Sequence, residues 1–499
     1  MLRALPRALI AVITLFIELT ILMILYYFIT SKFEFIDIIY SFFCLYIIFK
    51  IIKDSKSYSY TLPWIIIFMI IPIPGSIIYL TIKFNLKINK FIKNITREEK
   101  SSKKYLIQDE KIRSKFEKNS SIRYISDYSK FPVTTNNDVD YFSLGDYALD
   151  TILDELKKAE KFIFLEYFII HEGKMWNSML EILEEKAKSG VEVRVMYDDL
   201  GCLTTLKSNY FKKLEKKGIK CVAFNRLKPF AGVVMNNRDH RKILVIDGKV
   251  AFSGGINLAD EYINIGSKYG HWKDNCIRVK GDAVWNYTVM FLTLWNASRK
   301  DHDDDFEKYK YKYKDTNINK GFVVPYGENP LDGETTGEDI YLNIINNAND
   351  YVYIFTPYLI IDTDVIDALA LASKRGVDVR IVIPEIPDKK TVYTVSGSYI
   401  EPLVNAGVKV YKYTPGFVHA KVFVSDDKRA TVGTLNMDYR SLYLHFECGC
   451  YFEDHKVIED IKKDTLETIE KSRLVNNDKK PGHVRSFWQS ILRLFAPLM

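Results

Sequence analysis

The pattern of hydrophobic and polar positions divides the chain into an apolar N-terminal region and a longer region in which short apolar runs alternate with amphipathic stretches. Three apolar runs, Ala8 to Thr30, Ile38 to Phe49 and Ser57 to Ile82, fill most of the first 82 residues. The first run is long enough for the roughly 20 residues that cross a bilayer. No small-residue cleavage site follows it, which argues against a removed signal peptide. Residues 1–82 are therefore predicted to form a membrane region with two to three hydrophobic segments.

Two topologies stay open for this membrane region. Arg3 and Arg7 precede the first run, and lysines flank the third run on both sides. Positively charged flanks tend to stay in the cytoplasm, so the third run would dip into the bilayer and return. Its Pro72, Pro74 and Gly75 offer a break at which such a turn can form if protein covers the exposed backbone. In the alternative topology all three runs span the bilayer, and the rest of the chain lies outside.

The period of the pattern changes after a basic linker over residues 83–140. Residues 162–170 have the pattern of a buried strand, 174–189 that of a helix and 191–197 that of a second strand. The same order returns over residues 351–383. Alternation of strands and helices predicts parallel sheets covered by helices, which is an α/β fold.

This internal repeat defines the expected domains. A first α/β domain covers 141–300, a charged linker covers 301–320, and a second α/β domain covers 321–475. The amphipathic tail over 476–499 is predicted either to lie at a membrane surface or to close the core of the second domain. The first copy carries about ten extra apolar residues around 227–235, and three interpretations stay open: a loop that touches lipid, a lining of the substrate entrance, or plain packing.

The bulk composition adds two constraints. Hydrophobic residues make up 47% of the chain, which is ample for sizeable cores, and the net charge of +7 fits an anionic partner. That charge does not choose between a membrane surface and a nucleic acid. The six cysteines form no C-x-x-C pair, which favours a reducing, cytosolic setting for the globular part.

One polar pattern, His-x-Lys-x(4)-Asp followed by a later Asn, occurs twice in the chain. Its copies comprise His240, Lys242, Asp247 and Asn257, and His419, Lys421, Asp426 and Asn436. The constant offset means that the two halves present the same site. If each motif lies on a strand, its His and Lys point to one face, because side chains alternate with a period of two.

Two imidazoles and two ammonium groups suit a double displacement at a phosphodiester. The lysine charges would keep each imidazole neutral and therefore nucleophilic, and they would stabilise the extra negative charge on phosphorus. One histidine can attack while the other protonates the leaving oxygen and later deprotonates the incoming hydroxyl. A metal fits poorly, because each lysine places a cation beside its histidine and neither motif has a second His or Cys at ligand spacing. No metal or cofactor is expected.

These residues resemble the phospholipase D superfamily, and the match is closer to its bacterial cardiolipin synthases. The resemblance covers nearly the whole chain, and it is carried by residues 237–248, 251–257, 260–262, 271–274, 356–358, 436–441 and 485–498. It implies two tandem phospholipase D-like α/β/α sandwich domains that form one pseudo-twofold unit, preceded by N-terminal transmembrane helices.

The resemblance also implies a role for each motif residue. His240 would be the nucleophile that forms a phosphatidyl-histidine, and His419 the general acid and then base. Lys242, Lys421, Asn257 and Asn436 would hold the phosphate oxygens. Asp274 and Glu447 would orient the two histidines. Asp247 and Asp426 belong to the catalytic motifs as turn or strand-end residues that brace the site, not as proton carriers.

The membrane region favours a lipid as the substrate. The implied reaction transfers a phosphatidyl group from one phosphatidylglycerol to another and releases glycerol. The alternatives are a membrane phospholipase D, a phosphatidyltransferase with another acceptor such as ethanolamine, and a membrane-anchored nucleic-acid phosphodiesterase. The expected partners are phosphatidylglycerol and cardiolipin, without nucleic acid, and a homo-oligomer is allowed. The expected location is the bacterial cell membrane, with several spans and a cytoplasmic catalytic domain.

Overall fold

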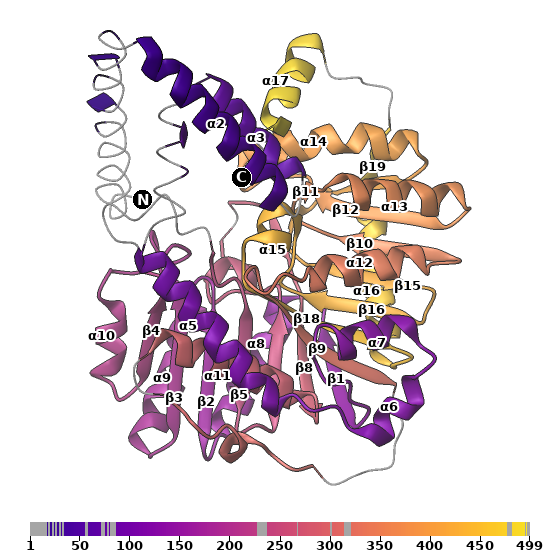
Figure 1. Cartoon of the computed structure of the whole chain (residues 1–499). Helices are drawn as coiled ribbons and strands as arrows, with labels where there is room; N and C mark the ends of the chain where they lie inside the picture. The colour runs from indigo at the N-terminus through magenta and orange to yellow at the C-terminus, as the bar shows by residue number, and fades with distance from the viewer. Residues whose placement is uncertain are drawn as a thin grey trace. The chain divides into compact units, whose positions relative to one another are not determined.

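A computed structural model places the chain in two compact units, coloured along the chain in Figure 1. One unit comprises residues 1–93, 227–236 and 483–499, and the other comprises 94–226 and 237–482. The structure describes residues 34–54, 58–70, 75–76, 79, 86–226, 237–266, 268–299, 302–313, 321–476, 482–494 and 496, with scattered positions between 17 and 31.

The first unit contains α2 (Glu34–Asp54), α3 (Tyr58–Ile70) and α17 (His483–Leu494). Cys44 of α2 and Phe68 of α3 belong to a small apolar cluster, whereas much of the rest of α2 is exposed. Within the described ranges, no helix combines the length and the apolar character needed to cross a bilayer. Most of the first predicted run, Pro72 and Pro74 of the third, and the insert at 227–235 lie outside the described residues.

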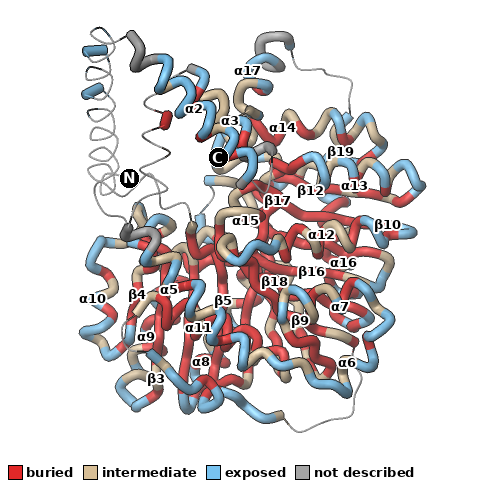
Figure 2. The backbone as a smooth tube through the Cα atoms, in the orientation of Figure 1, coloured by how far each residue is buried: buried red, intermediate tan, exposed pale blue. Residues whose placement is uncertain are grey.

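The second unit is built on two sheets, whose strands are buried in Figure 2 while the outer helices are more exposed. The first sheet has the order β1 (Asn137–Phe142), β8 (Cys276–Gly281), β6 (Val250–Gly254), β5 (Lys242–Ile246), β2 (Phe162–Tyr167), β3 (Glu192–Asp198) and β4 (Lys220–Phe224). The second has the order β19 (Ser472–Leu474), β13 (Lys409–Tyr413), β12 (Asp378–Pro384), β10 (Tyr351–Phe355), β15 (Val422–Ser425), β16 (Arg429–Gly433), β18 (Glu447–Glu453) and β9 (Phe322–Glu328). Read from β9 to β13, the second sheet repeats the strand order of the first, and β19 is an additional edge strand.

The sheets are mixed, which corrects the expectation of parallel sheets. Strands β2, β3 and β4 are parallel, but β5 pairs antiparallel with both β2 and β6. The reason lies in the motif itself. Asp247 and Gly248 adopt positive φ angles of 53° and 66° directly after β5, so the chain turns back into β6 as a hairpin. Asp426 and Asp427 make the corresponding turn after β15.

Helices cover these sheets, and one helix packs between them. The first half contributes α8 (Gly145–Lys157), α9 (Lys174–Lys188) and α10 (Tyr210–Glu215). The second contributes α12 (Thr336–Asn346), α13 (Thr363–Lys374), α14 (Lys390–Asn405), α15 (Tyr439–Tyr443) and α16 (Val457–Glu470). Helix α11 (Val284–Ser298) is buried almost all round, because it packs against β5 of one sheet and β9 of the other. An apolar surface on every side is what such a position requires.

The two segments expected to be linkers are folded. Residues 83–140 contain α5 (Leu86–Ser102), α6 (Glu110–Phe116), α7 (Ser120–Asp127) and the start of β1. The apolar face of α7 explains the difference, because Ile122 and Ile125 are buried. In the expected linker 301–320, Asp303 forms an ion pair with the buried Arg194 of β3. Residues 94–140 and 302–313 are therefore part of the second unit, whereas α5 begins in the first unit.

Candidate active site

The backbone of each motif histidine forms a hydrogen bond with the other half of the repeat. His240 lies just before β5, which begins at Lys242, whereas His419 and Lys421 both precede β15. This corrects the expectation that each histidine shares a strand face with its lysine. The His240 backbone N–H donates to the Phe446 carbonyl at 2.9 Å, and the His419 N–H donates to the Lys273 carbonyl at 2.7 Å. The accepting residue in each case directly precedes a buried carboxylate.

Those carboxylates bind the imidazoles across the two halves. His240 Nδ1 lies 2.8 Å from Glu447 Oε2, and His419 Nδ1 lies 2.6 Å from Asp274 Oδ2. An ionised carboxylate only accepts hydrogen bonds, so each Nδ1 carries the proton and each Nε2 is left with its lone pair. Glu447 and Asp274 are fully buried. The sequence predicted an orienting acid for each histidine, and the structure shows that the acids are exchanged between the halves.

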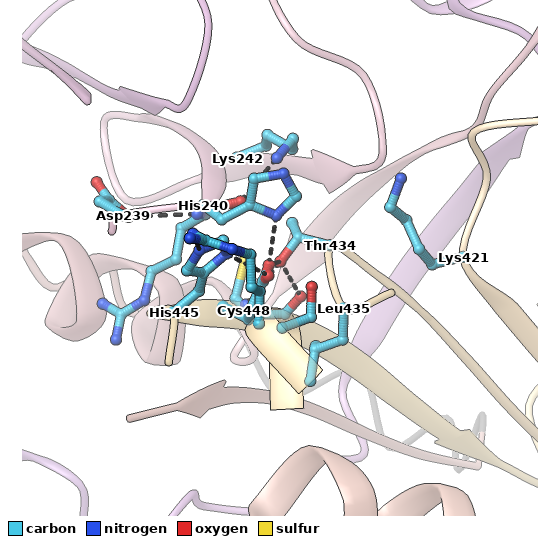
Figure 3. Close-up of polar contacts among 12 residues, drawn as sticks. Asp239, His240, Lys242, Lys421, Thr434, Leu435, His445 and Cys448 are labelled. Carbon is cyan, nitrogen blue, oxygen red and sulfur yellow. Dashed lines mark hydrogen bonds and ion pairs between the residues drawn. The ribbon is translucent and has the colours of Figure 1, made fainter. Parts of the chain in front are cut away.

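The two motif lysines bind the backbone beside the histidines, and Figure 3 shows both of them together with His240. Lys242 Nζ donates to the His240 carbonyl at 2.7 Å, and Lys421 Nζ donates to the His419 carbonyl. Both side chains are almost wholly buried. Burial lowers the pKa of Lys242 to about 8 and that of Lys421 to about 7. Two lysines at this depth are suited to neutralise an anionic group that enters between them.

Burial and the lysines keep both imidazoles neutral. The pKa of His240 is lowered well below its usual value, first by burial and then by the charges of Lys242 and Lys421. Burial, followed by Lys421, lowers the pKa of His419 to about 4, although Asp274 opposes the change. At neutral pH each Nε2 is therefore an unprotonated nitrogen, which is the form that attacks phosphorus or removes a proton.

The surroundings of the two dyads differ, although their hydrogen bonds match. Thr434 donates to the carboxylate that binds His240, at 2.5 Å from Glu447 Oε2. Gly255 holds the corresponding place in the first half, where an added Cβ would stand 1.9 Å from Asp274 Oδ1. The ring of His445 lies 5.7 Å from that of His240 between ring centroids, whereas His419 packs among Tyr262, Trp272 and Phe417.

Sequence reasoning missed Thr434 and His445. Thr434 faces a glycine in the alignment of the two halves, so the repeat gave no reason to select it. His445 had a usable signal, because it is one of only eight histidines and stands two residues before Glu447. A rare side chain beside an expected orienting acid is a candidate for the same site.

The two asparagines that were expected to hold phosphate are placed differently. Asn257 Oδ1 accepts from the Ile169 backbone at 3.1 Å, and its Nδ2 donates to the Tyr262 hydroxyl at 2.7 Å. Asn257 is fully buried and therefore fixes neighbouring parts of the first half. Asn436 bonds through its side chain to Asp438, and its Oδ1 has no hydrogen-bond partner within the described structure.

Asp247 and Asp426 lie past the far ends of β5 and β15, away from the histidines that precede those strands. The Asp247 carboxylate accepts the backbone N–H groups of 160–162 at 2.7 to 2.9 Å. Asp426 does the same for 349–351. Although both were grouped with the catalytic residues, each ties the motif hairpin to the start of the central strand. Their role in the structure is to brace the frame, and they touch no reacting group.

A buried acidic pair lies beneath His240 in the first half only. Glu166 of β2 is fully buried against Asp239, and it lies 3.9 Å from Arg241 Nη1. Burial raises the pKa of both carboxyls. The equivalent of Glu166 in β10 is Phe355. The sequence alone did not reveal this pair. Glu166 lies within an apolar strand, and its partner Asp239 is far away in the sequence.

Comparison with known proteins places this arrangement in a family. A family model described as "Cardiolipin synthase, PLD-like domain" matches residues 152–295 and 341–468, which contain both motifs and both orienting acids. The chain belongs to the cardiolipin synthase family. The match and the two sheets confirm the α/β fold with two phospholipase D-like domains, whereas the N-terminal transmembrane helices stay a prediction.

Relatives match over most of the chain. An uncharacterized protein of Streptococcus mutans is 44% identical over 443 residues, which cover 87% of this chain and 96% of that protein. A cardiolipin synthase of Clostridium perfringens is 33% identical over 467 residues, which cover 89% of this chain and 95% of that enzyme. Among solved structures, the phosphatidylserine synthase of Haemophilus influenzae aligns with a TM-score of 0.58 at 14% identity. That alignment covers 76% of this chain and 100% of the other, and it shows a shared fold.

Proposed function

We propose that this chain is a cardiolipin synthase that transfers a phosphatidyl group from one phosphatidylglycerol to a hydroxyl of a second and releases glycerol. Membership of the family makes it a phosphatidyltransferase of the phospholipase D type. The observation that carries the proposal is the exchanged pair of dyads. Each imidazole has its Nδ1 bound by a carboxylate from the other half and its Nε2 unprotonated, beside two buried lysines.

In the first step His240 Nε2 attacks the phosphorus of one phosphatidylglycerol. A bond forms between nitrogen and phosphorus, the bond to the glycerol oxygen breaks, and that oxygen takes a proton from His419. Glu447 accepts the Nδ1–H of His240 and stabilises the positive charge that develops on the ring. The phosphate itself is anionic and lies near His419, so its arrival favours the protonated form that this step needs.

In the second step His419 acts as a base, and His240 is the group that leaves phosphorus. His419 Nε2 removes the proton from a hydroxyl of the second phosphatidylglycerol, whose oxygen attacks the phosphorus. The nitrogen–phosphorus bond breaks, and His240 returns to its neutral state. Lys242 and Lys421 offset the negative charge on the phosphate oxygens in both steps. One phosphodiester replaces another, so the reaction needs no outside source of energy.

The membrane supplies both lipids in this proposal. The apolar runs of residues 1–82 would hold the enzyme in the bacterial cell membrane, with the catalytic unit on the cytoplasmic side. Helix α17 supports a contact with lipid, because Phe487 and Trp488 are exposed by 63% and 56%. Aromatic side chains with nearby arginines are typical of helices that lie at an interface.

The test uses the purified full-length protein and phosphatidylglycerol labelled in its headgroup glycerol, in mixed micelles with a chelator. Cardiolipin and free glycerol should appear in equal amounts. Phosphatidic acid without cardiolipin would show a hydrolase and reject the synthase. Substitution His240→Asn should abolish product formation. The matched control His302→Asn removes a half-exposed imidazole far from both motifs in sequence and should leave the rate unchanged.

A further inference from the structure

A third histidine lies against the dyad of His240 and has no part in the proposed reaction. His445 is only 8% exposed, and its Nδ1 lies 3.7 Å from Glu447 Oε1. Neither of these two buried atoms has a hydrogen-bond partner in the part of the chain that the structure describes. Buried polar atoms without partners are rare and costly, so two that face one another point to an interaction.

The proton on His445 can be placed from its other neighbour. Arg440 Nη1 lies 3.4 Å from His445 Nε2. A guanidinium can only donate a hydrogen bond, so Nε2 is the acceptor and the ring proton belongs on Nδ1. That N–H then faces Glu447 Oε1. A shift of the side chain by a few tenths of an ångström closes the gap to a hydrogen bond.

The other dyad shows what this second contact does. Asp274 uses both of its oxygens, because Oδ2 binds His419 and Oδ1 accepts the Asn275 backbone N–H at 2.8 Å. Glu447 places Oε2 on His240 and Thr434, and His445 is the group that faces its remaining oxygen. The His445 imidazole thus stands where the first half has a backbone amide.

We propose that His445 is a positioning residue, which donates its Nδ1–H to Glu447 and fixes the carboxylate that orients His240. The inference rests on the proposed function, in which His240 is the nucleophile. With both oxygens bound, the Glu447 carboxylate is held in its orientation toward His240. It also leaves the Nδ1 proton on His240 when the ring becomes positively charged.

A metal ion is the rival occupant of this cluster. One ligand atom from each of His240, His445 and Glu447 lies within 4.8 Å of the others. Binding a metal through His445 Nδ1 would move the ring proton to Nε2, directly against the donor of Arg440. The donor arrangement therefore favours a hydrogen bond to Glu447 over a metal.

Two substitutions separate positioning from packing. His445→Asn keeps an N–H donor near the place of Nδ1 but loses the ring, whereas His445→Leu keeps much of the apolar volume but has no donor. We expect kcat to fall about 10- to 100-fold in the Leu variant with KM almost unchanged, and to stay within about threefold in the Asn variant. A Leu variant as active as the Asn variant, or more active, would show a packing role and overturn the proposal.

The pH profile supplies a readout that packing would not move. The titratable and charged groups that face His445 are Glu447, His240 and Arg440. In the Leu variant Glu447 loses a donor, so its negative charge stabilises protonated His240 more strongly. The acid limb of kcat/KM should move to higher pH by about half a unit or more, and it should stay in place in the Asn variant. An unmoved limb in the Leu variant would count against the proposal.

The outcome can be separated from that of the proposed function. Both the consumption of phosphatidylglycerol and the formation of cardiolipin are measured. A protein that only hydrolyses the lipid would reject the synthase proposal, but the rates of the Leu and Asn variants could still be compared. If the wild type consumes no phosphatidylglycerol, ¹⁵N NMR of the His240 ring replaces the kinetics. The Nδ1–H tautomer of His240 should then be the only one populated in the wild type, and both tautomers should be populated in the Leu variant. Stoichiometric Zn²⁺ binding to the wild type that is lost in both variants would establish the metal site instead.

Discussion

His240 and Glu447 stand 207 positions apart in the chain, and a hydrogen bond of 2.8 Å joins their side chains. Asp274 makes the reciprocal bond to His419, across 145 positions. Neither half of the repeat contains both a motif histidine and the carboxylate that binds it. The site therefore exists only when the two domains are packed together, because each motif histidine is oriented by a carboxylate from the other domain.

Replacement of either orienting acid by its amide tests the tautomers of the histidines. In Glu447→Gln or Asp274→Asn, the amide N–H can donate to Nδ1 and leave the ring proton on Nε2, the atom that must react. We expect kcat to fall about 100- to 10,000-fold with little change in KM. Steady-state kinetics in mixed micelles measure this, and circular dichroism checks the fold. Loss of less than threefold would show that the acids do not set the tautomers.

The buried lysines predict an alkaline limit to activity. Burial lowers the pKa of Lys421 to about 7, so its positive charge is present below that pH and is lost as the pH rises through it. The rate constant kcat/KM reports groups of the free enzyme and should fall between about pH 7 and 8. In Lys421→Arg the charge persists, so any remaining activity should hold to higher pH. An identical alkaline limb in both proteins would assign the limb to another group.

Asp247 is expected to matter for stability and not for chemistry. Its carboxylate accepts three backbone N–H groups at the start of β2. Asn tolerates the positive φ of this turn but carries no charge and only one acceptor oxygen. Asp247→Asn should therefore lower the free energy of unfolding by about 1–3 kcal/mol, seen as a lower Tm. The kcat of the folded fraction should stay within about twofold, and a large loss of kcat at unchanged Tm would contradict the bracing role.

Gly255 is predicted to be irreplaceable for a reason of space. A Cβ at this position would stand 1.9 Å from Asp274 Oδ1, so the carboxylate would have to leave His419. Gly255→Ala should reduce kcat by more than tenfold. The control Gly482→Ala adds a methyl group where nothing lies within 4 Å and should be silent. Equal rates in the two variants would mean that the carboxylate can move without loss.

The duplicated motif made the reacting groups of the proposed site predictable. Its two histidines and two lysines lie together, and the strand at 162–170 and the helix at 174–189 appear as β2 and α9. Local periodicity carries such information, because strands and helices bury their own apolar faces. The direction of β5 was not accessible in this way, since it depends on a two-residue turn at Asp247.

The exchange of acids could not be read from spacing. A sequence shows that Asp274 follows the first motif and Glu447 the second, but which histidine each one reaches depends on how the two domains associate. The helices within 83–140 could not be read from the sequence for a related reason. The charged residues of this segment suggested a linker, while the apolar positions of α7, such as Ile122, need the second half before they are buried.

The crossed hydrogen bonds have a consequence for the history of the chain. A single ancestral half that met a second copy of itself about a twofold axis would assemble this site from identical parts, with each subunit completing the other. Joining the copies in one polypeptide removes the requirement that they stay identical. Thr434 aligns with Gly255, and His445 aligns with Trp272, so the surroundings of the two motif imidazoles now differ. Such differences would let a symmetric ancestor give rise to one attacking group and one proton carrier.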